Sequence, residues 1–168
     1  MEEFKAVNQK EERPTFLLVV CILSWISIGF AFLGTVWRLL RGPLSSEVMN
    51  ESKIEILNLV AEMRTNHMDS FADFFDKTIQ MSEVYNNNHY SYYLMVLITL
   101  LVGGYGVYNM FIGKKIGFHL YIVYSILGSV IFYIFMPAIM VPNLLVMWSV
   151  FFSLMFIFMY AANLKWLK

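Results

Sequence analysis

The sequence predicts an all-α, polytopic membrane protein: an antiparallel bundle of four transmembrane helices, with a long external amphipathic helix between spans one and two. Composition is the first observation, because 59% of the 168 residues are hydrophobic and only 14% are charged, whereas soluble domains carry about 25% charged residues. The second is a series of charge-free stretches long enough to cross a bilayer. The third is one segment, residues 44–83, that holds eight of the twelve carboxylates.

Spans one and two follow from stretches without Asp, Glu, Lys or Arg. The first stretch runs for 24 residues, from Pro14 to Trp37, and about 20 apolar residues suffice to cross the hydrocarbon core. The second runs for 30 residues, from Val84 to Gly113, and its later part is apolar. We therefore predict transmembrane helices at 14–40 and 89–113.

The external segment between these spans has the pattern of a single long amphipathic helix at 44–83. At about 100° per residue, its apolar side chains fall in one arc and its acids on the opposite side. An acidic face disfavours adsorption to anionic lipid, so we expect the helix to dock on protein. It either folds back over its own bundle or receives a partner subunit. The candidate partner-binding residues are Met63, Met68, Phe71, Phe74, Phe75, Asp69, Asp73 and Asp76.

Spans three and four share 49 residues without a charge, from Ile116 to Leu164. This stretch is too long for one crossing. Pro137 and Pro142 interrupt it, and proline ends a helix because it lacks an N–H and clashes with the preceding turn. We predict helices at 116–137 and 142–164, joined by a tight turn.

Lys114 and Lys115 set the predicted orientation. They are the only charged residues, histidine aside, between Val84 and Asn163, and membrane-flanking lysines are favoured on the cytoplasmic side. Together with the tails at 1–13 and 165–168 they hold seven of the twelve Lys and Arg residues, and five lie on the other face. We therefore expect both tails, and both termini, to be cytoplasmic.

Small residues in the predicted spans indicate where helices pack. In lipid, helices associate by close approach, so small side chains gather on shared faces. Hydroxyl groups on these faces could also line a small cavity, although hydrogen bonding between helices is the interpretation we favour. The candidate packing residues are Ser24, Ser27, Ala31, Gly34, Gly103, Gly104, Gly117, Gly128, Ser149 and Ser153.

The sequence lacks the residue patterns that several kinds of chemistry require. Cys21 is the single cysteine, which argues against thiol redox chemistry. No predicted span contains Asp or Glu, so proton-coupled transport lacks its usual carboxylate. His67, His89 and His119 are too scattered to predict a metal site, and no HExxH, GxSxG or Walker motif is present. We predict no catalytic residue, no cofactor, no metal and no nucleic-acid partner.

The stretch "RPTFLLVVCILSWISIGF", residues 13–30, resembles the first span of small uncharacterised four-helix inner-membrane proteins of Bacteroidota. The resemblance covers about a tenth of the chain and implies a bacterial inner membrane without implying an activity. We expect a non-enzymatic structural or accessory subunit, embedded in the lipid bilayer, that associates as a homo-oligomer or with another membrane protein. Two alternatives stay open: a small oligomeric transporter or channel, and a lipid- or small-molecule-binding protein with a cavity under the external helix.

Overall fold

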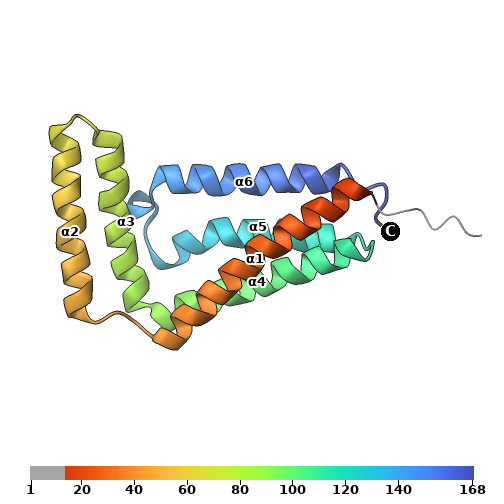
Figure 1. The fold of residues 1–168 in the computed structure, drawn as a ribbon, viewed down its shortest axis with the longest axis horizontal. Coiled ribbons are helices and arrows are strands. Elements are labelled where there is room, and N and C mark those ends of the chain that lie inside the picture. The colour runs from red at the N-terminus through yellow and green to blue at the C-terminus, as the bar shows by residue number, and fades with distance from the viewer. Residues whose placement is uncertain (1–13) are drawn as a thin grey trace, which may run out of the picture.

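A computed structural model describes residues 14–168, and every regular element in this range is a helix. The predicted tail at 1–13 lies outside the described residues. The elements, shown in Figure 1, are α1 (Thr15–Arg41), α2 (Ser46–Thr65), α3 (Asp69–Asn87), α4 (His89–Phe111), α5 (Ile116–Phe135), the short 3-10 helix η1 (Ala138–Met140) and α6 (Asn143–Ala161).

Four of these helices, α1, α4, α5 and α6, are long and apolar enough to cross a membrane. The prediction of four such helices in an all-helical chain is confirmed, and their ends differ from the predicted bounds by at most three residues. Proline sets the end of α5, because Met136 has φ −147° and ψ 154°, the extended region that a residue before proline prefers.

α4 lies between two neighbours: it packs against α1 and α5, and α5 packs against α6. Figure 1 shows α1 crossing obliquely over α4, with the start of α1 and the C-terminus at the same end. Near that end α6 reaches α1 through Tyr160, which is fully buried. The main apolar core includes Leu17, Val20, Cys21, Val107, Met110, Tyr121 and Tyr160.

Glycines allow α4 and α5 to approach closely. A Cβ at Gly103 would lie 2.7 Å from the Tyr124 ring, and one at Gly106 would lie 3.1 Å from the Gly117 carbonyl oxygen. At Gly117 a Cβ would overlap the backbone of Met110. A larger residue at Gly117 would therefore push the two helices apart, and one at Gly103 or Gly106 would displace its neighbour on α5.

The predicted single helix at 44–83 is wrong, because the segment folds as a hairpin of α2 and α3. At the end of α2, the Met68 N–H bonds to the Met63 carbonyl at 2.9 Å and the His67 N–H to the Arg64 carbonyl at 3.2 Å. His67 has φ 59°, and this left-handed residue completes a Schellman motif. Neither Gly nor Pro marks the turn, but histidine adopts this conformation more readily than most residues.

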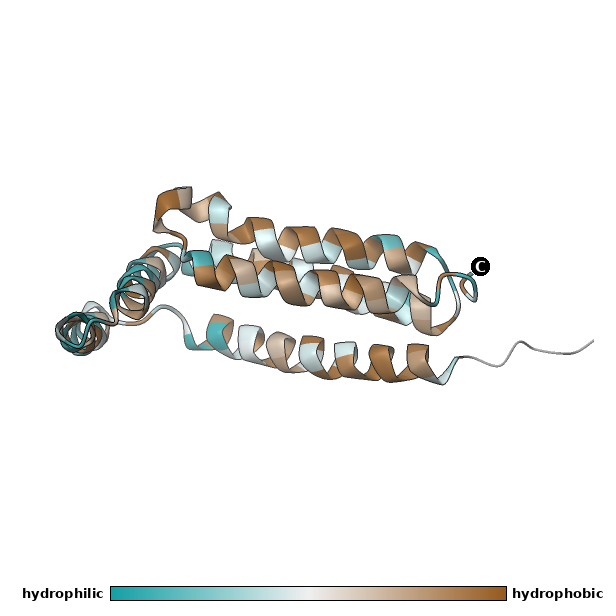
Figure 2. Ribbon diagram, turned by 90° about the horizontal axis from the view of Figure 1, so that it is seen from above, coloured by the Kyte–Doolittle hydropathy of each residue, from teal (hydrophilic) through white to brown (hydrophobic). Residues whose placement is uncertain are grey.

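The hairpin lies crosswise at one end of the four apolar helices, and its ribbon is visibly more hydrophilic than theirs (Figures 1 and 2). Two ion pairs join its helices. Lys53 Nζ lies 3.0 Å from Glu83 Oε2, and Arg64 Nη2 lies 2.9 Å from Asp73 Oδ1. Asp73, one of the acids predicted to bind a partner protein, therefore forms an ion pair within its own chain.

α3 connects the hairpin to the rest of the molecule. Met81 packs with Met136 and Val141 from the turn between α5 and α6. Asn86 clamps the loop before α2: the Leu44 N–H donates to Asn86 Oδ1 at 2.7 Å, and Asn86 Nδ2 donates to the Leu44 carbonyl at 3.0 Å. These contacts hold the hairpin across the end of the apolar helices.

Lys114 and Lys115 lie in the turn between α4 and α5, at the opposite end from the hairpin. Gly113, with φ 86°, forms this turn. The Lys168 N–H donates to the Gly113 carbonyl at 2.7 Å, and the Lys115 N–H donates to the Lys168 carbonyl at 2.9 Å. These bonds bring the C-terminal segment, with Lys165 and Lys168, onto the turn. In the described part of the chain, this end carries four lysines and no Asp or Glu.

Candidate functional site

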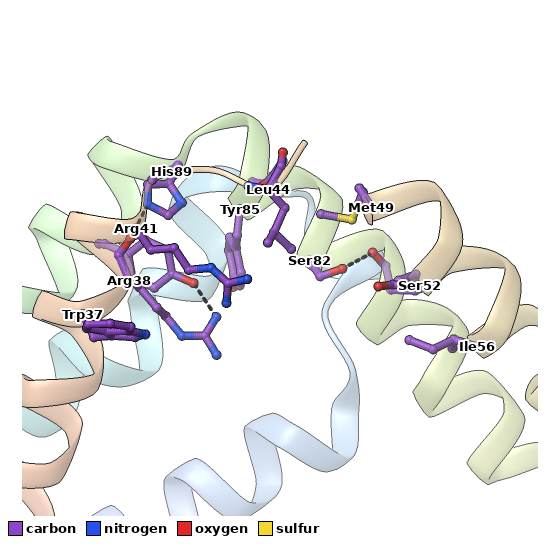
Figure 3. Close-up of a pocket in the computed structure, with 14 residues that line it drawn as sticks. Trp37, Arg38, Arg41, Leu44, Met49, Ser52, Ile56, Ser82, Tyr85 and His89 are labelled. Atoms are coloured by element: carbon purple, nitrogen blue, oxygen red, sulfur yellow. Dashed lines mark hydrogen bonds between the residues drawn. The ribbon is translucent and has the colours of Figure 1, made fainter. Parts of the chain in front are cut away.

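A pocket of about 470 Å³ lies where the end of α1, the hairpin and the start of α4 meet. We call it the hairpin pocket (Figure 3). Small-molecule sites typically have volumes of about 300–1,000 Å³, so its size suits a ligand. Its lining residues are Trp37, Arg38, Arg41, Gly42, Leu44, Met49, Ser52, Ile56, Ile79, Ser82, Tyr85, Asn86, His89 and Tyr93.

Arg38 and Arg41, in the last turn of α1, form the basic wall of the pocket. Arg38 Nη1 donates to the Tyr93 hydroxyl at 3.0 Å, and the guanidinium lies 5.7 Å from the centre of that ring. His89 Nε2 lies 2.9 Å from the Arg38 carbonyl oxygen. Because a carbonyl only accepts, His89 must carry a proton on Nε2 to make this bond. Tyr93 therefore positions the side chain of Arg38, and His89, which Figure 3 shows beside Arg38, positions its backbone.

No carboxylate offsets these charges among the lining residues. Within residues 14–168, Arg41 takes part in no ion pair, whereas Lys53 and Arg64 of the hairpin are both paired. A basic residue in the last turn also interacts favourably with the helix dipole, which is a purely structural reason for an arginine here. The planar guanidinium fork matches a carboxylate or phosphate group. The basic wall is therefore suited to an anionic ligand group.

The remaining wall is largely apolar and aromatic. Met49, Ile56 and Ile79 contribute aliphatic surface, and Tyr85 stacks on Tyr92 with ring centroids 3.8 Å apart. The Tyr85 hydroxyl is buried and forms no hydrogen bond of good geometry in the described part of the chain. Burial raises the pKa of Tyr85 well above its ordinary value, and the adjacent Tyr92 adds to the shift. The phenol therefore stays protonated and can donate to a ligand.

The predicted partner-binding residues do not line the hairpin pocket. Phe71, Asp73 and Phe74 instead line a second pocket, of about 400 Å³, between α3 and the start of α6. Asp73 is engaged by Arg64. Of the other predicted residues, Met68 and Asp69 are exposed, and Met63, Phe75 and Asp76 are partly buried.

Several predicted packing residues do lie between helices. Gly103 and Gly117 lie between α4 and α5, and a Cβ at Gly104 would lie 3.9 Å from Ile28 of α1. The Ser24 Oγ accepts a hydrogen bond from Tyr160. The Ser149 Oγ lies 3.4 Å from the Ser129 Oγ, between α6 and α5.

The other predicted packing residues lie at looser positions. A Cβ at Gly34 or Gly128 would have nothing within 4 Å. Ser27 and Ala31 are exposed on α1. Ser153 and Ser27 line a separate small cavity between α1, α5 and α6.

The sequence did not point to the residues of the hairpin pocket. In the sequence alone, Arg38 and Arg41 are recognisable only as charges on the hairpin side of the membrane. His89 is recognisable only as an isolated histidine. The available signal is the spacing of the two arginines, three positions apart, which places both on one side of the last helical turn. Nothing in the sequence indicates that His89 and Tyr93, about fifty positions later, meet them.

The fold and these features define a helical protein with four apolar helices, compatible with an integral membrane protein. No protein-family model, no curated protein sequence and no solved structure matches the chain. In residues 14–168, no group of three or more His, Cys, Asp or Glu side chains could hold a metal ion. The function is therefore argued from the geometry of the hairpin pocket.

Proposed function

We propose that this chain is a non-enzymatic integral membrane protein that binds an anionic amphiphile in the hairpin pocket. The observation that carries the proposal is the pair Arg38 and Arg41, which line a pocket without any carboxylate among its lining residues. The proposal develops the third expectation from the sequence, a lipid- or small-molecule-binding protein with a cavity under the external segment.

The position of the pocket suits a ligand with an anionic head and an apolar tail. Trp37 is 67% exposed at the end of an apolar helix, as is typical of a tryptophan at the membrane–water interface. An anionic head at this level would meet the two guanidinium groups and the Tyr85 hydroxyl. The apolar tail would lie toward the bilayer along the surface of α1. Both arginines are exposed, and water screens exposed charges, so the proposed site depends on both guanidinium groups acting together.

The proposal includes an orientation: an antiparallel four-span bundle in a bacterial inner membrane, with the termini cytoplasmic and the hairpin outside. The four lysines at the end away from the hairpin support it, because membrane-flanking lysines are favoured on the cytoplasmic side. Arg38 and Arg41 flank a membrane span on the hairpin side, so the same preference applied to them alone would favour the reverse orientation. A ligand-binding role gives a separate reason for their position.

Binding of dodecyl phosphate to the purified protein in neutral detergent tests the proposal. We expect saturable binding of dodecyl phosphate and none of dodecanol, which has the same chain without the charge. Replacing Arg38 and Arg41 together by glutamine keeps most of both side chains but removes the charges. This change should weaken binding at least about tenfold, the equivalent of roughly 1.4 kcal/mol.

Lys77→Gln and Lys165→Gln are the matched controls, because each removes one positive charge outside the hairpin pocket. Both should bind dodecyl phosphate like the wild type. Equal binding by the double arginine variant and the wild type would show that the pocket is not the anion site.

A second candidate function is that of a membrane subunit that packs against itself or another membrane protein, and α6 favours it. Only 6% of the 18-residue apolar stretch of α6 is buried within the chain, whereas 39% of the corresponding stretch of α4 is buried. Trp148 contacts Phe151 and Phe152 on the exposed side of α6. A cysteine at Phe151, in a chain with Cys21→Ser, should form a disulfide-linked dimer in membranes if α6 is a self-association face. A cysteine at Ile126, exposed on α5, is the control and should not.

A further inference from the structure

The small cavity between α1, α5 and α6 that Ser27 and Ser153 line is distinct from the hairpin pocket. It has a volume of about 130 Å³ and is lined by four serines, Ser24, Ser27, Ser125 and Ser153, together with aromatic side chains. We call it the midspan cavity. None of its lining residues is charged.

The midspan cavity lies at the middle of the apolar helices. Ser125 is the tenth residue of the 20-residue α5, and Ser153 is the eleventh of the 19-residue α6. At about 1.5 Å per residue, each serine lies roughly 15 Å from the start of its helix. The hydrocarbon core is about 30 Å thick, so these hydroxyl groups lie near its midplane.

Ser125 provides an unused hydrogen-bonding group in this cavity. The residue is only 6% exposed, and its Oγ has no hydrogen-bond partner in the described part of the chain. Ser129, one turn further along α5, differs in this respect because its Oγ donates to the Ser125 carbonyl at 3.1 Å. A buried hydroxyl group without a partner is unfavourable unless a ligand or water completes it.

The rest of the cavity defines what could bind. Ser24 already has a partner, because its Oγ accepts a 2.8 Å hydrogen bond from the Tyr160 hydroxyl. Tyr124 and Phe152 provide aromatic walls. Ser27 and Phe152 are exposed, so the cavity opens between α1 and α6 toward the surrounding lipid.

We propose that the midspan cavity binds the uncharged ring of a membrane-dissolved lipid of the quinone class, whose carbonyl oxygen accepts a hydrogen bond from Ser125 Oγ. A charged head is excluded at this depth because charge at the bilayer centre is costly. The volume of about 130 Å³ is below the roughly 300–1,000 Å³ typical of sites that enclose a whole small molecule, so only a single flat ring would lie between the aromatic walls, and the apolar tail would remain in the bilayer. The site is independent of the hairpin pocket, which requires an anionic head at the membrane surface.

Titration with a decyl-substituted benzoquinone tests the proposal, with the full chain in phosphatidylcholine nanodiscs. Trp148 stacks on Phe152 with ring centroids 5.6 Å apart, so a quinone in the cavity should quench its fluorescence. We expect a saturable component of quenching above the linear component that partitioning into lipid produces. Trp148→Phe should lose the saturable component and retain the linear one.

Variants of neighbouring serines make the test specific. Ser125→Ala should raise the dissociation constant about tenfold, and Ser153→Leu, which fills the cavity, should abolish saturable binding. Ser129→Ala is the matched control on the same helix and should bind like the wild type. Decanol, which has a hydroxyl group but no ring, should compete at least tenfold more weakly than the quinone.

Three outcomes would overturn the proposal. Strictly linear quenching in the wild type would mean that the cavity does not bind the quinone. Equal dissociation constants for Ser125→Ala and the wild type would remove Ser125 from the site. Competition by decanol as strong as that of the quinone would exclude a ring-specific site.

Discussion

Tyr160 and Ser24 are 136 positions apart in the sequence, and a 2.8 Å hydrogen bond joins their side chains. This bond connects α6 to α1 at one of the serines that line the midspan cavity. The Tyr160 ring also packs against Tyr121 of α5, with centroids 4.8 Å apart. One buried tyrosine therefore links three of the four apolar helices.

Replacing Tyr160 by phenylalanine should lower stability while leaving the fold intact. The change removes the hydroxyl that donates to Ser24 Oγ at 2.8 Å and lies 3.3 Å from the Val20 carbonyl oxygen, both on α1, and keeps the ring contact with Tyr121. Hydrogen bonds between helices in membranes contribute about 0.6 kcal/mol on average and up to about 1.7, so we expect a loss within that range. Thermal unfolding in detergent measures it, with Tyr133→Phe, an exposed position on α5, as the control. A loss of the same size at Tyr133 would mean that the Ser24 bond contributes nothing specific.

Glycine substitutions should divide into two groups according to the space around each residue. Gly117→Ala places a Cβ against the α4 backbone, and overpacking of this kind costs about 1–3 kcal/mol. Gly128→Ala has nothing within 4 Å of the added Cβ, and alanine is the better helix former by up to about 1 kcal/mol. Thermal unfolding should therefore show destabilisation at Gly117 and neutrality or stabilisation at Gly128. The reverse order would contradict the close approach of α4 and α5.

The raised pKa of Tyr85 predicts that the protein loses stability at alkaline pH. Burial raises its pKa in the folded protein above the ordinary value of 10.0, so the protonated phenol favours the folded state. The unfolded chain releases this proton as the pH rises past about 10, while the folded chain retains it. Stability present below pH 10 is therefore lost as the pH increases further. Melting temperatures at pH 8 and pH 11 should differ less in Tyr85→Phe than in the wild type. A Tyr90→Phe control, at an exposed position, should behave like the wild type.

The proposed orientation predicts which positions are labelled from each side of the membrane. In a Cys21→Ser chain, a cysteine at Thr65 at the tip of the hairpin should react with an impermeant maleimide outside intact cells. A cysteine at Ile112, which follows α4 beside the lysine turn, should react only after the membrane is opened. Both residues are exposed, so access to the reagent and not burial decides the result. Labelling of both positions from one side would contradict the four-span arrangement.

The four apolar helices were predictable because their signal is local. Charge-free stretches and the prolines at 137 and 142 define each helix without reference to its neighbours, since lipid requires every spanning segment to be apolar and internally hydrogen-bonded. Gly103 and Gly117 were likewise identifiable as packing residues. Gly34 and Gly128 carry the same sequence signal but lie in open space. Whether a small residue meets a neighbour depends on how helices are rotated, which composition does not encode.

The sequence by itself determined the number of apolar helices, their approximate ends and the concentration of acids in the segment between the first two. Only the tertiary structure decided that this segment turns back at His67, because a Schellman turn without glycine leaves no pattern in the chain. The tertiary structure also brought Arg38, Arg41 and His89 to one pocket and brought Ser24 and Ser125 into the lining of another. The physical reason is the distance along the chain over which each effect acts. Hydropathy and proline determine structure within a few residues, whereas a pocket forms where packing brings together side chains that are far apart in the sequence.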